Sequence, residues 1–169
     1  MIVVKDKSLA DIGILENAYN VGVKRLTNEL WTASFSLPKT DPKNSLCDHL
    51  NYIEITSTSG RYYGLYRIMP TETIKSEGDD SITYTCEHVF ATLLDDVMDG
   101  YFQYSGYSTS QVIQYLLNLQ ETKRWSLGQV DFNYMYEYSF ENENGLLAPI
   151  LSLPMPFNEA YEFSFDTQV

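Results

Sequence analysis

Two cysteine and histidine pairs are the residues of this chain best suited to covalent catalysis. Cys47 precedes His49 by two positions, and Cys86 precedes His88 by the same spacing. A thiolate becomes a nucleophile when an imidazole beside it takes its proton, and residues two apart on a strand share one face. Neither pair has the surrounding sequence of a papain-like or amidase nucleophile. We therefore expect no catalytic residue and interpret both pairs as partly buried strand residues.

Paired carboxylates are the second group that could do chemistry. A glycosidase needs two carboxyl groups roughly 5–10 Å apart, one of them with a raised pKa. Asp95, Asp96 and Asp99 cluster at the end of an expected helix, and Glu141 and Glu143 follow an expected strand. We interpret the first group as a solvated helix end and the second as a solvated loop.

Metal and cofactor sites are not indicated by the sequence. With only two cysteines, far apart, and two histidines, the chain has no four-ligand zinc pattern and no disulfide framework. Asp79-Asp80 lacks the alternating ligand spacing of a calcium loop, and no glycine-rich phosphate loop with a lysine occurs. We expect no metal, no cofactor and two reduced thiols.

Length and hydropathy limit the possible classes of protein. A chain of 169 residues is long enough for one ordinary domain or two small ones, with about 70% of its unfolded surface buried on folding. The first residues lack the apolar core of a signal peptide, and no stretch approaches the roughly 20 apolar residues of a membrane span. We expect folding in a cytoplasm.

Charge is distributed unevenly along the chain. The net charge is -12; residues 1–75 hold nine Lys or Arg and eight Asp or Glu, whereas residues 76–169 hold two and fifteen. An anionic surface repels phosphate backbones, which argues against sequence-specific nucleic-acid binding. Solubility explains the charge simply. A surface over which DNA passes without binding would also carry a negative charge.

The first half of the chain is predicted to be a series of antiparallel strands. Trp31, Ala33, Phe35 and Leu37 alternate with polar residues, as in a strand with one buried face, and residues 39–50 are expected to form a loop. Turn signals at residues 57–60 and 77–80 predict hairpins that join residues 52–57 to 61–69 and residues 71–76 to 81–86. This many short strands indicates a barrel or a sandwich.

Helical periodicity begins near His88. Apolar residues recurring four apart predict an amphipathic helix over Glu87–Asp99 that ends at Gly100, followed by an aromatic loop over residues 101–107. Ser108 and Gln111 fit a capping box that opens a second helix. A short helix is also expected within residues 144–153.

An aromatic strand is predicted near the end of the chain. Aromatic residues occupy every second position, namely Phe132, Tyr134, Tyr136, Tyr138 and Phe140. Packing against the two helices explains this pattern, and the alternatives are a sugar-stacking platform or a subunit contact made by Tyr134, Tyr136 and Tyr138. Residues 161–165 are expected to form a final apolar strand, and because such a strand needs a partner we expect that the natural polypeptide, or an ancestral version of it, continues beyond this point.

The order of these parts resembles a known family. The segments are Trp31-Thr-Ala-Ser-Phe-Ser-Leu-Pro38, Tyr62-Tyr-Gly-Leu-Tyr-Arg-Ile68, Thr83-Tyr-Thr-Cys-Glu-His88, Leu93-Leu94-Asp95, Ser110–Leu117, Trp125-Ser-Leu-Gly-Gln-Val130 and Phe163-Ser-Phe-Asp-Thr167. Together they resemble the N-terminal region of phage minor structural tail proteins, the baseplate hub or tail-associated lysin (prophage tail endopeptidase-like) family. The resemblance covers nearly the entire chain.

This resemblance implies a fold and a set of partners. The implied fold is α+β and mostly β, an antiparallel β-barrel-like hub domain with inserted helices. The implied assembly is a homotrimer at the tail tip that contacts the distal tail protein and the tape measure protein, with DNA passing through its channel. Asp95, Asp96 and Asp99 are candidates for lining that channel. Many relatives carry a C-terminal wall-cleaving domain, and because this chain stops before one, cleavage is not expected.

Three functional hypotheses follow. The first is a structural component of a phage or prophage tail tip, made in the host cytoplasm. The second is a carbohydrate-binding β-module for bacterial wall polysaccharide, and the third, a wall hydrolase, would require turnover that we do not expect. The expected parts are a β-barrel-like domain over residues 1–87, a helical insertion over 88–124, and an aromatic strand, short helix and closing strand over 125–169.

Overall fold

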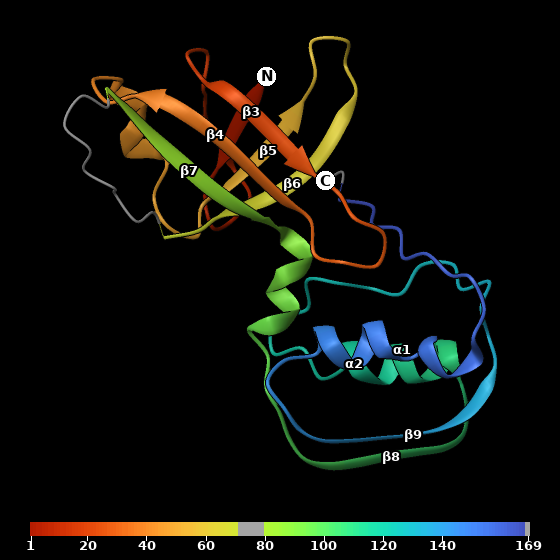
Figure 1. The fold of residues 1–169 in the computed structure, drawn as a ribbon. Helices are drawn as coiled ribbons and strands as arrows, with labels where there is room; N and C mark the ends of the chain where they lie inside the picture. The colour runs from red at the N-terminus through yellow and green to blue at the C-terminus, as the bar shows by residue number, and fades with distance from the viewer. Residues whose placement is uncertain (71–79, 168–169) are drawn as a thin grey trace. The chain divides into compact units, whose positions relative to one another are not determined.

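The chain divides into two compact units. A computed structural model describes residues 1–70 and 80–167 (Figure 1). Unit 1 comprises Met1–Val89 with Phe165–Val169, and unit 2 comprises Phe90–Ser164. Antiparallel strands with a few short helices make up these units, so the expected mostly-β, α+β class is confirmed.

Unit 1 is built on one seven-stranded sheet. Its strands are β1 (Ile2–Lys5), β2 (Asp11–Ile14), β3 (Tyr19–Lys24), β4 (Thr32–Pro38), β5 (Tyr52–Thr56), β6 (Tyr62–Ile68) and β7 (Ser81–His88). They lie in the order β2-β1-β5-β6-β7-β4-β3, and every recorded pairing is antiparallel. The outermost strands, β2 and β3, are consecutive in the sequence.

That strand order requires the sheet to curve strongly. In a flat seven-stranded sheet the six spacings of about 4.8 Å would hold β2 and β3 about 29 Å apart. The chain from Ile14 to Tyr19 reaches only about 18 Å when fully extended. The sheet therefore curls so that its edges approach each other. No hydrogen-bonded pairing of β2 with β3 is found among the described residues, so closure into a barrel remains a prediction.

The core of unit 1 follows the predicted alternation. In β4 the side chains of Ala33, Phe35 and Leu37 are buried, and the Phe35 ring stacks on Tyr84 of β7 with centroids 5.0 Å apart. At the predicted turn of residues 57–60, the Ser57 amide donates to the Arg61 carbonyl at 2.8 Å. The second predicted hairpin involves residues 71–79, which lie outside the described part. Residues 39–50 include a 3₁₀ turn, η1 (Pro42–Leu46).

Unit 2 packs two helices on a two-stranded sheet. Strands β8 (Met98–Ser108) and β9 (Met135–Glu143) pair antiparallel, and helices α1 (Thr109–Leu117) and α2 (Leu147–Ser152) lie over one side of them (Figure 1). Two 3₁₀ turns, η2 (Val89–Leu94) and η3 (Met155–Phe157), complete the unit. The apolar side chains between these layers are buried; they are Met98, Val112, Ile113, Leu116, Leu117, Tyr138, Phe140, Leu146, Leu147, Ile150 and Leu153.

Two helix predictions are confirmed. Helix α1 begins where the capping box predicted, and the Ser108 amide donates to Gln111 Oε1 at 2.9 Å. Its apolar residues face the core of unit 2. Helix α2 lies within the predicted range of residues 144–153, and the chain leaves it before Pro154 and Pro156, where no helical amide is available.

Other predictions for this half of the chain are wrong. The helix expected over Glu87–Asp99 is instead the end of β7, the short turn η2 and the start of β8. The residues expected to form a loop, 101–107, are part of β8. Gly100 and Gly106 adopt positive φ angles of 93° and 75°, and the ladder shifts its register there. Glycines at such bulges resemble turn signals in a sequence. Residues 161–165 form no strand.

Candidate functional site

The two thiol and imidazole pairs are not prepared for catalysis. Cys86 and His88 share the buried face of β7 and are 2% and 1% exposed. The His88 ring packs against Trp31, Tyr66 and Phe165 at centroid distances of 4.9, 5.5 and 5.4 Å. Burial raises the pKa of the Cys86 thiol and lowers the pKa of His88 to about 4. Both groups are therefore neutral near pH 7, whereas a nucleophile of this kind is a thiolate.

The other pair is separated by its environment. Cys47 is buried after η1, and burial raises the pKa of its thiol to about 12. His49 is exposed to solvent. A buried thiol and an exposed imidazole cannot share a proton as a catalytic pair does.

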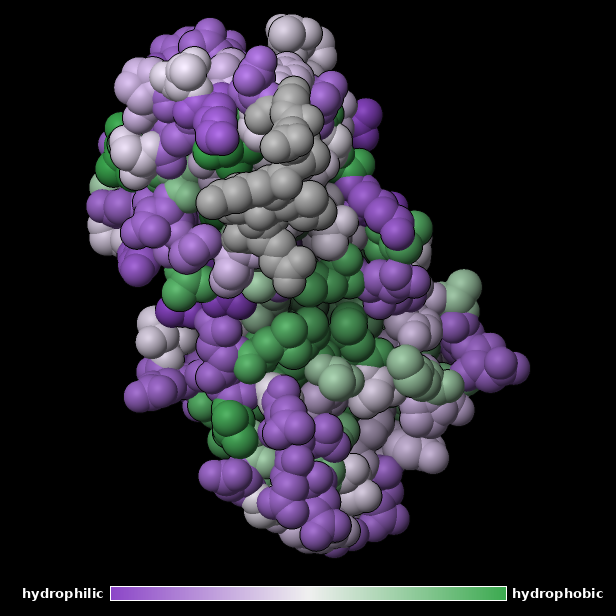
Figure 2. Space-filling model, turned by 60° about the vertical axis from the view of Figure 1, so that its left-hand side comes forward, coloured by the Kyte–Doolittle hydropathy of each residue, from purple (hydrophilic) through white to green (hydrophobic). Residues whose placement is uncertain are grey.

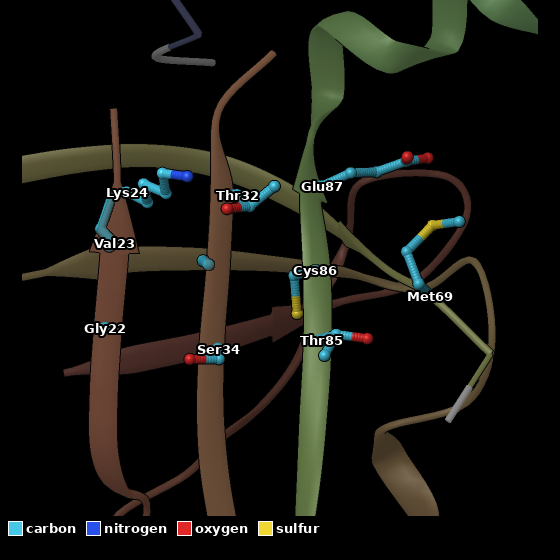
Figure 3. Close-up of a pocket in the computed structure, with 10 residues that line it drawn as sticks. Gly22, Val23, Lys24, Thr32, Ser34, Met69, Thr85, Cys86 and Glu87 are labelled. Atoms are coloured by element: carbon cyan, nitrogen blue, oxygen red, sulfur yellow. The ribbon is translucent and has the colours of Figure 1, made fainter. Parts of the chain in front are cut away.

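An open pocket of about 590 Å³ lies on unit 1 across β3, β4 and β7 (Figure 3). Small side chains on neighbouring strands create it, because Gly22, Ser34 and Thr85 stand side by side in the register. Glu87 at its margin forms an ion pair with Arg67 at 2.6 Å. The thiol of Cys86 belongs to the core cluster beneath. The lining thus combines hydroxyl groups and apolar side chains with two charged groups, Lys24 and Glu87.

No group of three metal-ligating side chains occurs among residues 1–70 and 80–167. Within the same residues, no helix combines the length and apolar character needed to cross a membrane.

The acidic residues proposed for a channel lie in unit 2 between η2 and β8. Asp95 forms an ion pair with Arg124 at 3.2 Å, and Asp96 Oδ1 accepts the Glu121 amide at 2.9 Å. Asp99 is exposed at the start of β8. Two of these three carboxylates therefore contact neighbouring segments of the same unit, and a channel role stays a proposal.

The edges of the unit 1 sheet expose apolar side chains. Ile12 and Ile14 of β2 are 38% and 42% exposed, and Tyr19 and Val21 of β3 are 42% and 44% exposed. Figure 2 shows that hydrophilic and hydrophobic residues both reach the surface on the face that it draws. Exposed apolar side chains on an outer strand favour association with another chain.

The aromatic strand predicted from Phe132 corresponds to β9, which begins at Met135, so Phe132 and Tyr134 lie in the segment before it. Tyr138 is 6% exposed and donates its hydroxyl to the Leu153 carbonyl at 3.0 Å, so it helps to hold α2. Tyr134 and Tyr136 are 44% and 46% exposed. Together with Phe132 and Phe157 they form what we call the aromatic cluster, in which the Phe157 ring lies 5.0–5.4 Å from the other three.

Sequence reasoning missed the buried amide of Gln120. This side chain is 3% exposed, donates to the carbonyls of Leu117 and Trp125, and accepts the amides of Arg124 and Trp125. It fixes the turn after α1, and the Trp125 indole then donates to Thr92 at 3.0 Å. A glutamine in a polar segment gives no sequence signal of such a role.

The fold is similar to that of a secretion-system protein. No family model matches the chain, and no curated protein is significantly similar to it in sequence. Among solved structures, an Escherichia coli protein, c3393, aligns with 91% of this chain at 13% identity and a TM-score of 0.52. That protein is described as a component of the type VI secretion system with structural similarity to the T4 bacteriophage tail proteins gp27 and gp5.

A tail protein from Neisseria meningitidis MC58 aligns with 69% of this chain at 12% identity and a TM-score of 0.44. The chain spans 42% and 32% of the lengths of these two structures.

Proposed function

We propose that this chain is a structural component of a phage or prophage tail tip, within the baseplate hub. The observation that carries the proposal is the fold of 91% of the chain, which is similar to that of c3393, itself described as similar to T4 tail proteins. Fold alone does not dictate function. The proposal therefore also depends on what the surfaces of this chain offer.

Assembly is the activity that these surfaces support. The apolar side chains of β2 and β3 are partly exposed on the two outermost strands of the sheet, where another chain can contact them. We propose a homotrimer that docks to the distal tail protein and the tape measure protein. The chain would then be found in the virion tail tip after synthesis in the host cytoplasm.

A structural role without catalysis is part of the same proposal. The thiols are buried and neutral, and the glutamate in the lining of the unit 1 pocket is held by Arg67. The acids of unit 2 fit a surface that DNA passes without binding. Asp99→Lys tests that idea best, because its side chain is exposed: DNA ejection unchanged by this variant would remove Asp99 from the channel.

Light scattering coupled to size-exclusion chromatography tests the assembly. We expect a concentration-dependent trimer of the full chain, lost in Val21→Lys, which places a charge on the β3 edge. Val97→Lys is the matched control, since Val97 is 62% exposed in unit 2. A strict monomer at high concentration that also fails to bind a distal tail protein would count decisively against the proposal.

A carbohydrate-binding module is the second candidate. The exposure of Tyr134 and Tyr136 favours it, because stacking on a sugar needs an accessible ring. Ring geometry weakens it: Tyr136 meets Tyr138 and Phe157 at interplanar angles of 57° and 70°, so the rings do not form one flat platform. Calorimetric titration with wall polysaccharide that shows no heat of binding would eliminate this candidate.

A further inference from the structure

The exposed aromatic side chains lie at the start of β9 and in the segment before it. Helix α2 ends at Ser152, and Phe157 of η3 is the ring that meets the remaining aromatic side chains. Tyr134 and Tyr136 keep almost half of their surface exposed although Phe132 and Phe157 contact them. Exposed tyrosines around a partly buried phenylalanine are typical of the centre of a protein interface.

The backbone beneath this cluster is already ordered. Thr109 donates its amide and its hydroxyl to the Tyr134 carbonyl at 2.8 and 3.0 Å. The side chain of Asn133 accepts the Ser110 amide at 3.1 Å and the Ser110 hydroxyl at 2.8 Å, so it ties the same segment to the start of α1. Rings held on an ordered backbone lose little further freedom when a partner binds.

The unit that contains the cluster is strongly acidic. Residues 125–169 contain no lysine or arginine, and unit 2 as a whole has ten Asp or Glu against Lys123 and Arg124. The Tyr134 hydroxyl donates to the Glu159 carboxylate at 3.2 Å, which fixes an anion at the edge of the rings and raises the pKa of Tyr134. An acidic partner or a nucleic acid would be repelled here.

We propose that the aromatic cluster binds a basic segment of a partner polypeptide, with arginine or lysine side chains over Tyr134 and Tyr136 and facing Glu159. A guanidinium combines a planar cation that stacks on an aromatic face with donors that fit a carboxylate. Unit 1 of the same chain contains this type of contact, because the Arg25 guanidinium lies 4.5 Å from the Trp31 ring centroid. The inference does not depend on the tail-tip proposal.

Fluorescence anisotropy tests the inference with the full chain. The probe is a fluorescein-labelled peptide of repeated Arg-Leu units, and a repeated Glu-Leu peptide of equal length is the charge control. We expect saturable binding of the basic peptide alone, about tenfold weaker in Tyr136→Ala. Tyr136→Phe keeps the ring and should restore the affinity. Glu159→Gln should weaken binding about threefold and lower its salt dependence.

Two matched variants control for general effects. Tyr101→Ala removes a tyrosine that is 61% exposed outside the cluster, and Glu141→Gln removes an exposed acid of β9. Both should bind like the unaltered chain. Equal losses in these controls and in Tyr136→Ala would overturn the proposal, because diffuse acidity would then explain the binding. It would also be overturned by absent peptide binding, by self-association that only Tyr136→Ala abolishes, or by a neutral oligosaccharide as the sole ligand.

Discussion

Replacement of Gln120 by alanine tests how the turn after α1 is held. The side chain makes four hydrogen bonds, donating at 2.7 and 2.9 Å to the Leu117 and Trp125 carbonyls and accepting at 2.9 and 3.2 Å from the Trp125 and Arg124 amides. Gln120→Ala leaves four backbone groups without this partner. It also loosens the segment that holds the Trp125 ring against Phe90, where the centroids are 5.1 Å apart.

The size of the effect follows from these bonds. Each net hydrogen bond contributes about 1 kcal/mol, and an unsatisfied buried group costs about 1–3 kcal/mol. Arg124 is exposed and Trp125 half-buried, so water can reach part of the freed backbone. We therefore expect Gln120→Ala to lower the free energy of unfolding by about 2–4 kcal/mol. Gln114→Ala, which removes an exposed bond from the same helix to Asn118, should change it by less than about 0.5 kcal/mol.

Urea unfolding followed by tryptophan fluorescence measures this difference. The chain has two tryptophans, Trp31 in unit 1 and Trp125 in unit 2, so a Trp31→Phe background reports on unit 2 alone. Separate reporting matters because two compact units need not unfold as one. If Gln120→Ala and Gln114→Ala unfold at the same urea concentration with equal slopes, the buried amide does not stabilise the turn and the reasoning fails.

Three further predictions concern unit 1. The pKa of His88 is about 4 in the folded chain and 6.5 in the unfolded chain, so the unfolded state binds more protons between these pH values. The free energy of unfolding should therefore fall as the pH drops from 6.5 to 4. In urea titrations at a series of pH values, His88→Phe should remove that dependence. Cys47 and Cys86 should react with a thiol-specific disulfide reagent at pH 8 only after unfolding, and rapid reaction of the folded chain would contradict their burial. Arg67→Met and Glu87→Gln should each lower the free energy of unfolding by about 3 kcal/mol, and in a double-mutant cycle the two together should lower it by less than the sum. Additive losses would show that the two side chains are not coupled.

Sequence patterns predicted those elements whose apolar residues recur with the period of a strand or a helix. The β4 strand and helix α1 each bury one complete face, and each has a local end signal, Pro38 or the capping box at Ser108. Strand β8 was missed because Gly100 and Gly106 interrupt its pattern at bulges. The apolar spacing that predicted a helix before Gly100 corresponds instead to η2, which buries Phe90 and Leu93 within two turns.

Site residues were predictable only in part. The alternation of aromatic residues correctly indicated a strand at Tyr136 and Tyr138, but Tyr134 lies before its start at Met135. Which of the rings are covered depends on where α2 ends. The contact with Phe157, more than twenty residues further along the chain, has no local signal. The fixing of Asp95 by Arg124 is likewise a tertiary contact that its spacing in the sequence does not reveal.

We propose above that this chain is part of the tip of a phage-type tail. Immunogold electron microscopy tests it most directly, with an antibody against the full chain applied to tail particles released from cells that carry its gene. We expect the gold particles to label the end of the tail that faces the host. Particles that bind no gold, although the protein is abundant in the same cells, would contradict it.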